Sequence, residues 1–162
     1  MLILTATRFN TQTWSDRQRW IDNNNWTGSI YGTPVRVKDT IHGTMIVLEM
    51  HNDENKVKAI GLVKSHAIPT DKTHQIYNDR NYNRYIYKSQ YRLVLDEIEL
   101  LPMEKKIIAI FDELLFKGAW HLMRAQGITA VPEWRMQNNQ VDFLKYFKEM
   151  LARHFKQSKL DD

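Results

Sequence analysis

The sequence predicts an α+β fold: a small, mostly antiparallel, barrel-like sheet with one N-terminal helix and two C-terminal helices. Short segments rich in β-branched residues fill the first two-thirds of the chain, and two segments with helical spacing follow them. The 162 residues include no cysteine and are 43% hydrophobic, which is enough for one core that needs no disulfide. We therefore expect one domain over residues 1–157 and a flexible tail over 158–162.

The first elements follow from local signals. Residues 2–7 predict an opening strand, and Thr13 is a suitable N-cap for a helix that ends at the asparagines of residues 23–25. Residues 26–32 contain two glycines and are expected to form a loop. Residues 34–37 then predict a short strand.

The best strand pair is expected over residues 44–50 and 57–63, joined by a polar hairpin loop at residues 52–55. Residues 85–95 alternate between apolar and basic side chains, which indicates one half-buried strand. The intervening residues 66–84 are polar and irregular.

The two C-terminal helices are indicated by apolar residues at helical spacing. The first is expected from Glu104 through Leu122, with Gly127 as its stop. The second is expected to begin after Asn138 or Asn139. The residues that we expect to form its buried face are Val141, Leu144, Phe147, Leu151 and Phe155.

The order of strand, helix, aromatic-glycine loop and hairpin over residues 1–65, with the strand Ala59-Ile60-Gly61-Leu62-Val63, resembles the PUA-like superfamily, which includes ASCH, EVE and YTH domains. The resemblance implies a barrel that binds RNA or DNA, with an aromatic pocket for a modified base in EVE and YTH relatives. Trp26 and Tyr31 would lie near such a pocket. The insert at residues 66–84 departs from this pattern, and residues 82–88 and 115–124 more faintly resemble uncharacterised proteins of large DNA viruses.

The strongest local signal for a ligand is a stretch of mixed basic and tyrosine residues before residue 92. Arg84, Lys88 and Arg92 would project from one face of a strand, about 13 Å apart, where they could follow a phosphate backbone. The alternative is a solvated strand edge that its basic side chains protect from aggregation. The formal net charge of +4 is too small to decide between these interpretations.

A second basic group is expected on the first C-terminal helix. Lys117, His121 and Arg124 are spaced so that they share one side of a helix, with Glu113 able to pair with Lys117. They could bind phosphate, or they could simply complement the helix dipole.

We therefore expect a non-catalytic nucleic-acid-binding domain that uses no metal and no cofactor, with a reader of a modified or single-stranded base as the specific form of this expectation. One alternative is an enzyme: Asp39, Glu54 and Lys56 match the loose spacing of a metal-dependent nuclease, and Lys38, Thr40 and Glu49 could serve a small base-modifying hydrolase. The other alternative is an interaction module for an acidic partner protein.

Sequence signals for export and membrane insertion are missing. The N-terminus does not have the features of a signal peptide, and no apolar stretch approaches ~20 residues. We expect an intracellular protein of the cytoplasm or nucleus that has no membrane partner.

Overall fold

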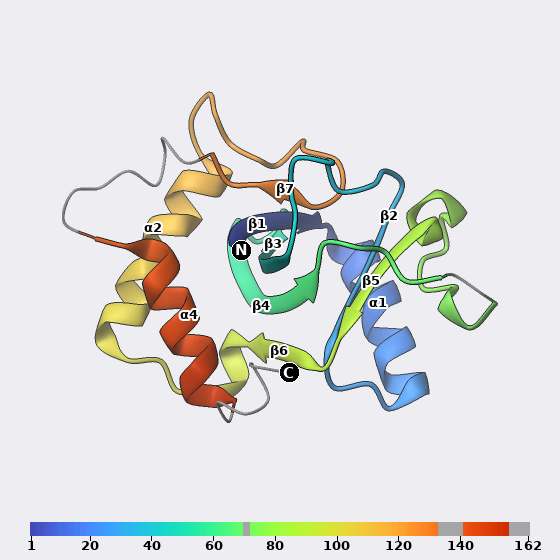
Figure 1. Cartoon of the computed structure of the whole chain (residues 1–162), viewed down its shortest axis with the longest axis horizontal. Coiled ribbons are helices and arrows are strands. Elements are labelled where there is room, and N and C mark those ends of the chain that lie inside the picture. The colour runs from blue at the N-terminus through green and yellow to red at the C-terminus, as the bar shows by residue number, and fades with distance from the viewer. Residues whose placement is uncertain (70–71, 133–140, 156–162) are drawn as a thin grey trace.

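The computed structural model describes residues 1–69, 72–132 and 141–155, which form a mixed α+β fold (Figure 1). The strands are β1 (Leu2–Phe9), β2 (Ser29–Thr33), β3 (Thr44–His51), β4 (Lys56–Lys64), β5 (Tyr85–Ser89), β6 (Tyr91–Val94) and β7 (Thr129–Ala130). The helices are α1 (Thr11–Asn24), α2 (Pro102–Phe116) and α4 (Phe143–His154), with short 3₁₀ turns η1 (Lys72–His74), η2 (Arg80–Asn83) and η3 (Leu95–Glu97). The predicted α+β class, with one early and two late helices, is confirmed.

Most of the described strand pairs are antiparallel, as predicted. The larger sheet has the order β6-β4-β3-β1-β7, and β2 pairs with β5 in a second sheet. The exception is the parallel pair of β1 and β3, which the chain connects through α1 and β2. The larger sheet is open and does not close into a barrel, because β6 and β7 are its two edges.

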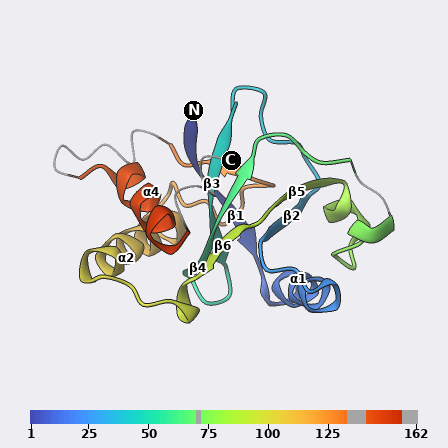
Figure 2. The same cartoon turned by 60° about the horizontal axis from the view of Figure 1, so that its bottom comes forward.

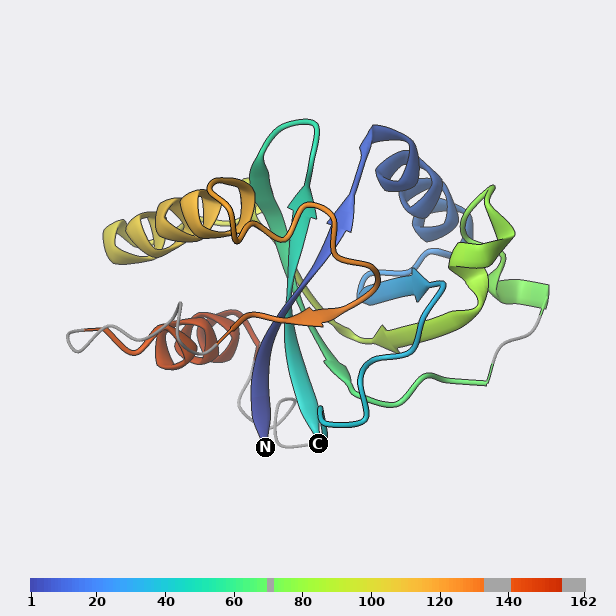
Figure 3. The ribbon, with the colours of Figure 1, turned by 90° about the horizontal axis from the view of Figure 1, so that it is seen from above.

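The larger sheet is covered on both faces (Figure 3). Helices α2 and α4 pack on one face, while α1 and the β2–β5 pair lie on the other. Alternate residues of β3 therefore enter two different cores: Ile46 and Leu48 face α2 and α4, whereas Met45 and Val47 face β2 and β5. This explains why seven consecutive residues of β3 are buried.

Helix α1 begins earlier than the sequence predicts. Asn10, not Thr13, is the N-cap, and its side chain accepts a hydrogen bond from the Thr13 backbone N–H at 2.8 Å. The Thr13 hydroxyl in turn accepts from the Asn10 backbone N–H at 3.0 Å, which completes a capping box. The predicted end is confirmed, because Asn25 adopts the left-handed conformation that stops the helix.

The predicted loop at residues 26–32 and strand at residues 34–37 are wrong. The strand is β2, and its glycine is required by close packing: a Cβ at Gly32 would overlap the Tyr82 carbonyl oxygen and lie 2.9 Å from the Tyr77 ring. Glycine often indicates a loop, but Gly32 is needed in this strand because the backbone at Tyr82 packs closely against it.

The single strand predicted for residues 85–95 is also wrong, because it is divided between the two sheets (Figure 2). Strand β5 pairs with β2, and β6 pairs with β4. The chain turns at Gln90, where the Ser89 hydroxyl donates a hydrogen bond to the Leu62 carbonyl and accepts one from the Tyr91 backbone N–H. The expected side-chain alternation therefore does not continue through the whole segment.

Helix α2 is shorter than predicted. It ends at Phe116, and Gly118 follows with a positive φ of 81°, so residues 117–128 form a loop and Gly127 does not end the helix. In α4, Phe147 and Leu151 are buried as predicted, and the other three expected residues pack at the margin of the same core. The predicted tail at 158–162 lies outside the described residues.

The hairpin prediction is confirmed, since β3 and β4 form an antiparallel pair around the turn at residues 52–55, with a shift of register between Glu49 and Met50. Within the described part of the chain, no helix has both the length and the hydropathy that a bilayer crossing requires.

Candidate functional site

The predicted basic face of Arg84, Lys88 and Arg92 does not form. Arg84 is exposed at the end of η2, Lys88 is half-buried on β5, and Arg92 lies on β6 in the other sheet. The Lys88 ammonium lies 4.2 Å from the centre of the Trp26 ring and 5.4 Å from that of Trp20. The structure thus brings Lys88 and Trp26, two of the predicted binding residues, together. The Lys88 ammonium, however, occupies one face of the Trp26 ring, on which a base was expected to stack.

Arg92 and Tyr31 belong to a buried charge network instead of a ligand surface. Both carboxylate oxygens of Glu49 accept from Arg92 at 2.9 Å, and the Tyr31 hydroxyl donates to one of them at 2.7 Å. Arg17 completes the network, with its Nη2 2.7 Å from Glu49 and its guanidinium 4.2 Å from the Phe9 ring centre. Arg17, Glu49 and Tyr31 are almost fully buried, and Tyr31, which was predicted for a base pocket, lines neither of the two cavities described below.

Lys117, His121 and Arg124 do not share a helical face, because α2 ends before them. Lys117 pairs with Glu113 at 2.8 Å, as the sequence predicted, and both side chains are exposed. The His121 ring accepts a hydrogen bond from the Met123 backbone N–H, and Arg124 is exposed in the same loop.

The residues proposed for catalysis do not assemble. Asp39 precedes β3 and Glu54 follows it, so a strand about 26 Å long lies between the positions of the two carboxylates that would need to bind the same metal ion. Glu49 of the alternative hydrolase set is enclosed by its arginines. No group of three or more metal-ligating side chains is present in the described ranges.

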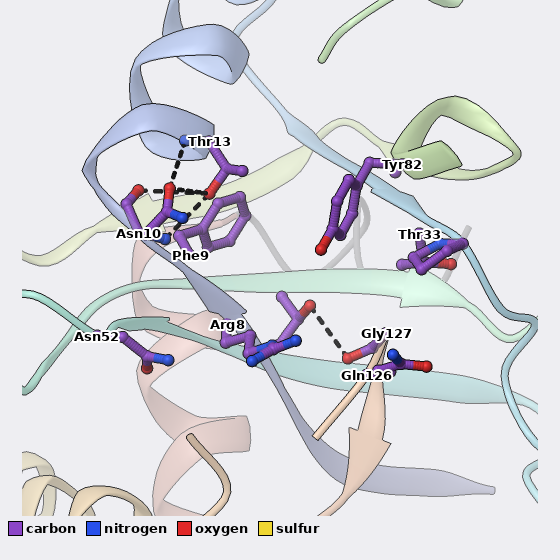
Figure 4. A pocket seen from close by; sticks show the side chains of 12 residues that line it. Arg8, Phe9, Asn10, Thr13, Thr33, Asn52, Tyr82, Gln126 and Gly127 are labelled. Carbon is purple, nitrogen blue, oxygen red and sulfur yellow. Dashed lines mark hydrogen bonds between the residues drawn. The ribbon is translucent and has the colours of Figure 1, made fainter. Parts of the chain in front are cut away.

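A polar pocket of about 250 Å³ lies where β1 ends and α1 begins (Figure 4). We call it the polar pocket. Its walls come from the β1–α1 junction, the end of β2, the β3–β4 turn, η2 and the loop before β7. The lining residues are Thr7, Arg8, Phe9, Asn10, Thr13, Gly32, Thr33, Pro34, Asn52, Tyr82, Gln126 and Gly127. Among the residues that the structure describes, this lining contains one cation and no carboxylate.

Asn52 lines this pocket with its orientation fixed. Its Nδ2 donates to the Met123 carbonyl oxygen at 2.9 Å, which fixes the orientation of the amide because a carbonyl can only accept. The Oδ1 atom is enclosed by the protein and has no hydrogen-bond partner among the described residues. A buried acceptor without a partner costs about 1–3 kcal/mol.

Arg8 and Tyr82 supply donors. One Arg8 nitrogen donates to the same Met123 carbonyl at 3.1 Å, which holds the guanidinium at the pocket wall. The Tyr82 side chain enters from the opposite side with its hydroxyl directed towards the middle of the pocket (Figure 4). The pocket therefore offers a charged donor and a hydroxyl group, which can donate or accept, to a small polar ligand.

A second depression of about 520 Å³ lies beside the β2–β5 pair. We call it the arginine–tyrosine cleft. It is lined by Arg36, Val37, Asp39, Ser65, His66, Ala67, Ile68, Pro69, Arg84, Tyr85 and Tyr87. Of the predicted binding residues, Arg84 is the one that lines this cleft.

Sequence reasoning missed Arg8, Asn52, Tyr82 and Arg36. One signal could have found the first two: the order strand, helix, strand over residues 2–51 is compatible with a parallel pair, whose carboxyl ends meet at one edge. Arg8 and Asn52 lie at that edge, next to the helix N-terminus. No local pattern indicates that Tyr82 reaches the same place.

In comparisons with known proteins, no family model, curated protein or solved structure matches the chain.

Proposed function

We propose that this protein binds single-stranded nucleic acid without catalysing a reaction on it, and that the polar pocket receives one unpaired base. The observation that carries the proposal is that the cavity brings the Arg8 guanidinium, the Tyr82 hydroxyl and the fixed amide of Asn52 together. The edge of a nucleobase presents donors and acceptors together, and single-strand readers commonly use amide and aromatic side chains for it.

The size of the pocket supports a base. A volume of about 250 Å³ is below the ~300 Å³ at which pockets for drug-sized ligands begin, so it suits one ring system better than a whole nucleotide. The absence of carboxylates from the lining also suits a polyanionic ligand. Such a ligand accords with the intracellular location expected from the cysteine-free sequence.

The test measures binding of labelled ten-nucleotide RNA and DNA homopolymers and of an abasic strand of equal length. We expect the protein to prefer at least one base-containing strand over the abasic strand. Tyr82→Phe should reduce that preference by about five- to tenfold, because it removes the hydroxyl directed into the pocket. Asn81→Ala, at an exposed position outside the pocket, is the matched control and should leave the preference unchanged.

Fluorescence anisotropy gives the affinities, and circular dichroism checks that each variant is folded. Equal affinity for abasic and base-containing strands in the unmodified protein would refute the base pocket. The absence of binding to every strand at low salt would refute nucleic-acid binding altogether.

A further inference from the structure

The arginine–tyrosine cleft concentrates positive charge around one ring. The guanidinium carbons of Arg36 and Arg84 lie 5.3 and 5.5 Å from the centre of the Tyr85 ring. Both arginines are exposed, and neither forms an ion pair with a carboxylate among the described residues. Among the described residues that line the cleft, Asp39 is the only acidic one, and His66 adds a further nitrogen donor or acceptor.

Two like charges held beside one ring repel each other, and an exposed cation–π contact contributes only about 0.5–1 kcal/mol. An arrangement of this kind is complementary to a dianion or to successive monoanions. Guanidinium groups are well suited to phosphate, because their planar donors can bind two of its oxygens at once.

The backbone around the cleft is held in place independently of any ligand. The Val37 backbone N–H donates to the Tyr87 hydroxyl at 2.9 Å, which ties the segment of Arg36 to β5. Tyr85 faces Thr33 in the β2–β5 register, and Ile68 bridges to Ile86 on the other side of β5. The two guanidiniums therefore project from a fixed frame.

The polar pocket and the cleft are lined by neighbouring positions on two segments. Residues 33–34 line the pocket and residues 36–37 line the cleft, while Tyr82 belongs to the pocket and Arg84 and Tyr85 to the cleft. Three residues of chain span at most about 10 Å, so on both segments the two linings lie close to each other.

We infer that the arginine–tyrosine cleft is a phosphate subsite, in which Arg36 and Arg84 bind the phosphodiester groups next to the base held in the polar pocket. The inference that these phosphate groups belong to a nucleic-acid strand rests on the proposed function. Tyr85 is a positioning residue in this site, because both guanidiniums lie against its ring and it orients them.

The experiment compares two double variants that remove the same charge. Arg36→Gln with Arg84→Gln alters the cleft, whereas Lys105→Gln with Lys106→Gln alters exposed positions on α2, which packs on the opposite face of the sheet (Figure 3). Affinity for a ten-nucleotide strand is measured between 50 and 300 mM salt. The cleft variant should weaken binding about tenfold or more at low salt. It should also reduce the log–log salt slope by about 1.4, that is ~0.7 for each of two lost phosphate contacts.

Equal effects of the two double variants would overturn the subsite, even if the strand still binds. If no strand binds to the unmodified protein, the proposed function fails and the cleft is tested alone with dimethyl phosphate and inorganic phosphate. NMR signals of the arginine side chains report on that titration. Saturable shifts at Arg36 and Arg84, lost in Tyr85→Leu, would retain the phosphate site, and unchanged shifts would refute it.

Discussion

Glu49 shows how one buried residue can fix the arrangement of several elements. Its carboxylate lies on β3 and contacts Arg17 of α1, Tyr31 of β2 and Arg92 of β6. Burial alone would raise the pKa of this carboxyl group, but the two arginines and the hydrogen bonds outweigh it and lower the pKa from 4.5 to about 2. Burial raises the pKa of Tyr31 well above 10, and the charge of Glu49 adds to that shift.

The lowered pKa of Glu49 makes stability depend on pH in a defined direction. A carboxyl whose pKa is lower in the folded state stabilises the fold fully above its unfolded pKa of 4.5. That contribution is lost as the pH falls towards the folded value of about 2. The shift corresponds to about 3 kcal/mol. We expect this part of the free energy of unfolding to disappear between about pH 4.5 and 2, which urea titrations at several pH values can measure.

Glu49→Gln should lower the free energy of unfolding by about 3–5 kcal/mol at pH 7, because it leaves two buried arginines without a counter-charge. The difference from the unmodified protein should shrink below pH 4.5, as Glu49 itself becomes protonated. Glu113→Gln removes an exposed pair with Lys117 and should change stability by no more than ~1 kcal/mol. A difference for Glu49→Gln that stays constant from pH 7 to pH 2.5 would contradict the coupling.

At the scale of elements, Gly61 explains how β2 can lie against β4. A Cβ at this position would overlap the Tyr31 hydroxyl and lie 2.5 Å from the Ser29 hydroxyl oxygen. The glycine that carries the apolar-glycine-apolar pattern of β4 is therefore required by the approach of β2, which brings Tyr31 to Glu49.

Gly61→Ala should cost about 1–3 kcal/mol of stability through overpacking. Tyr31→Phe removes the hydroxyl that the new methyl group would meet, so the double variant should be more stable than the sum of the two single effects, by at least ~0.5 kcal/mol. Chemical denaturation of the four proteins measures this coupling.

Gly118→Ala is the control for the cycle, since no atom lies within 4 Å of its Cβ position and its cost comes from the positive φ alone. It should combine additively with Tyr31→Phe. Additivity of Gly61→Ala with Tyr31→Phe would show that the close approach of β2 and β4 does not determine the effect.

The elements differ in how far local sequence predicts them. The β3–β4 hairpin and the C-terminal end of α1 could be predicted because their signals, a polar turn and an asparagine in the left-handed conformation, lie within a few residues. Strand β2 and the division of β5 from β6 could not, because they depend on partners far away in sequence. Ser29 pairs with Ser89, and Gly61 with Arg92.

At the scale of the whole molecule, the larger sheet connects two cores. Strands β1, β3 and β4 send alternate residues into both, so loosening one core should disturb the strands that form the other. Trp14, Trp20 and Trp26 lie on the α1 side, whereas α2 and α4 pack around Phe111 on the other.

Phe111→Ala should lower the free energy of unfolding by about 3–5 kcal/mol, because the ring is fully buried between Phe143 and Phe147. Tryptophan fluorescence, which reports mainly on the α1 side, and far-ultraviolet circular dichroism should show coincident transitions. Separate transitions would indicate two independently folding halves and contradict the expected single domain.

The sites were less predictable than the fold. The sequence indicated that basic and tyrosine residues near position 85 matter for a ligand, and Arg84 does line a cleft with Tyr85. The sequence could not distinguish Arg84 from Arg92. Alternation of side chains along a strand places both arginines on the same face, but it does not show that Arg92, and not Arg84, contacts Glu49. The polar pocket combines five separate segments, so no local pattern could reveal it.

The sequence by itself determined the α+β class, the early and late helices, the β3–β4 hairpin and the Glu113–Lys117 pair, since each depends on residues near one another in the chain. The tertiary structure decided which arginines are buried, where β2 lies, and which side chains meet in the polar pocket and the cleft. Those outcomes depend on contacts between residues 30 to 120 positions apart, and local periodicity carries no information about such partners.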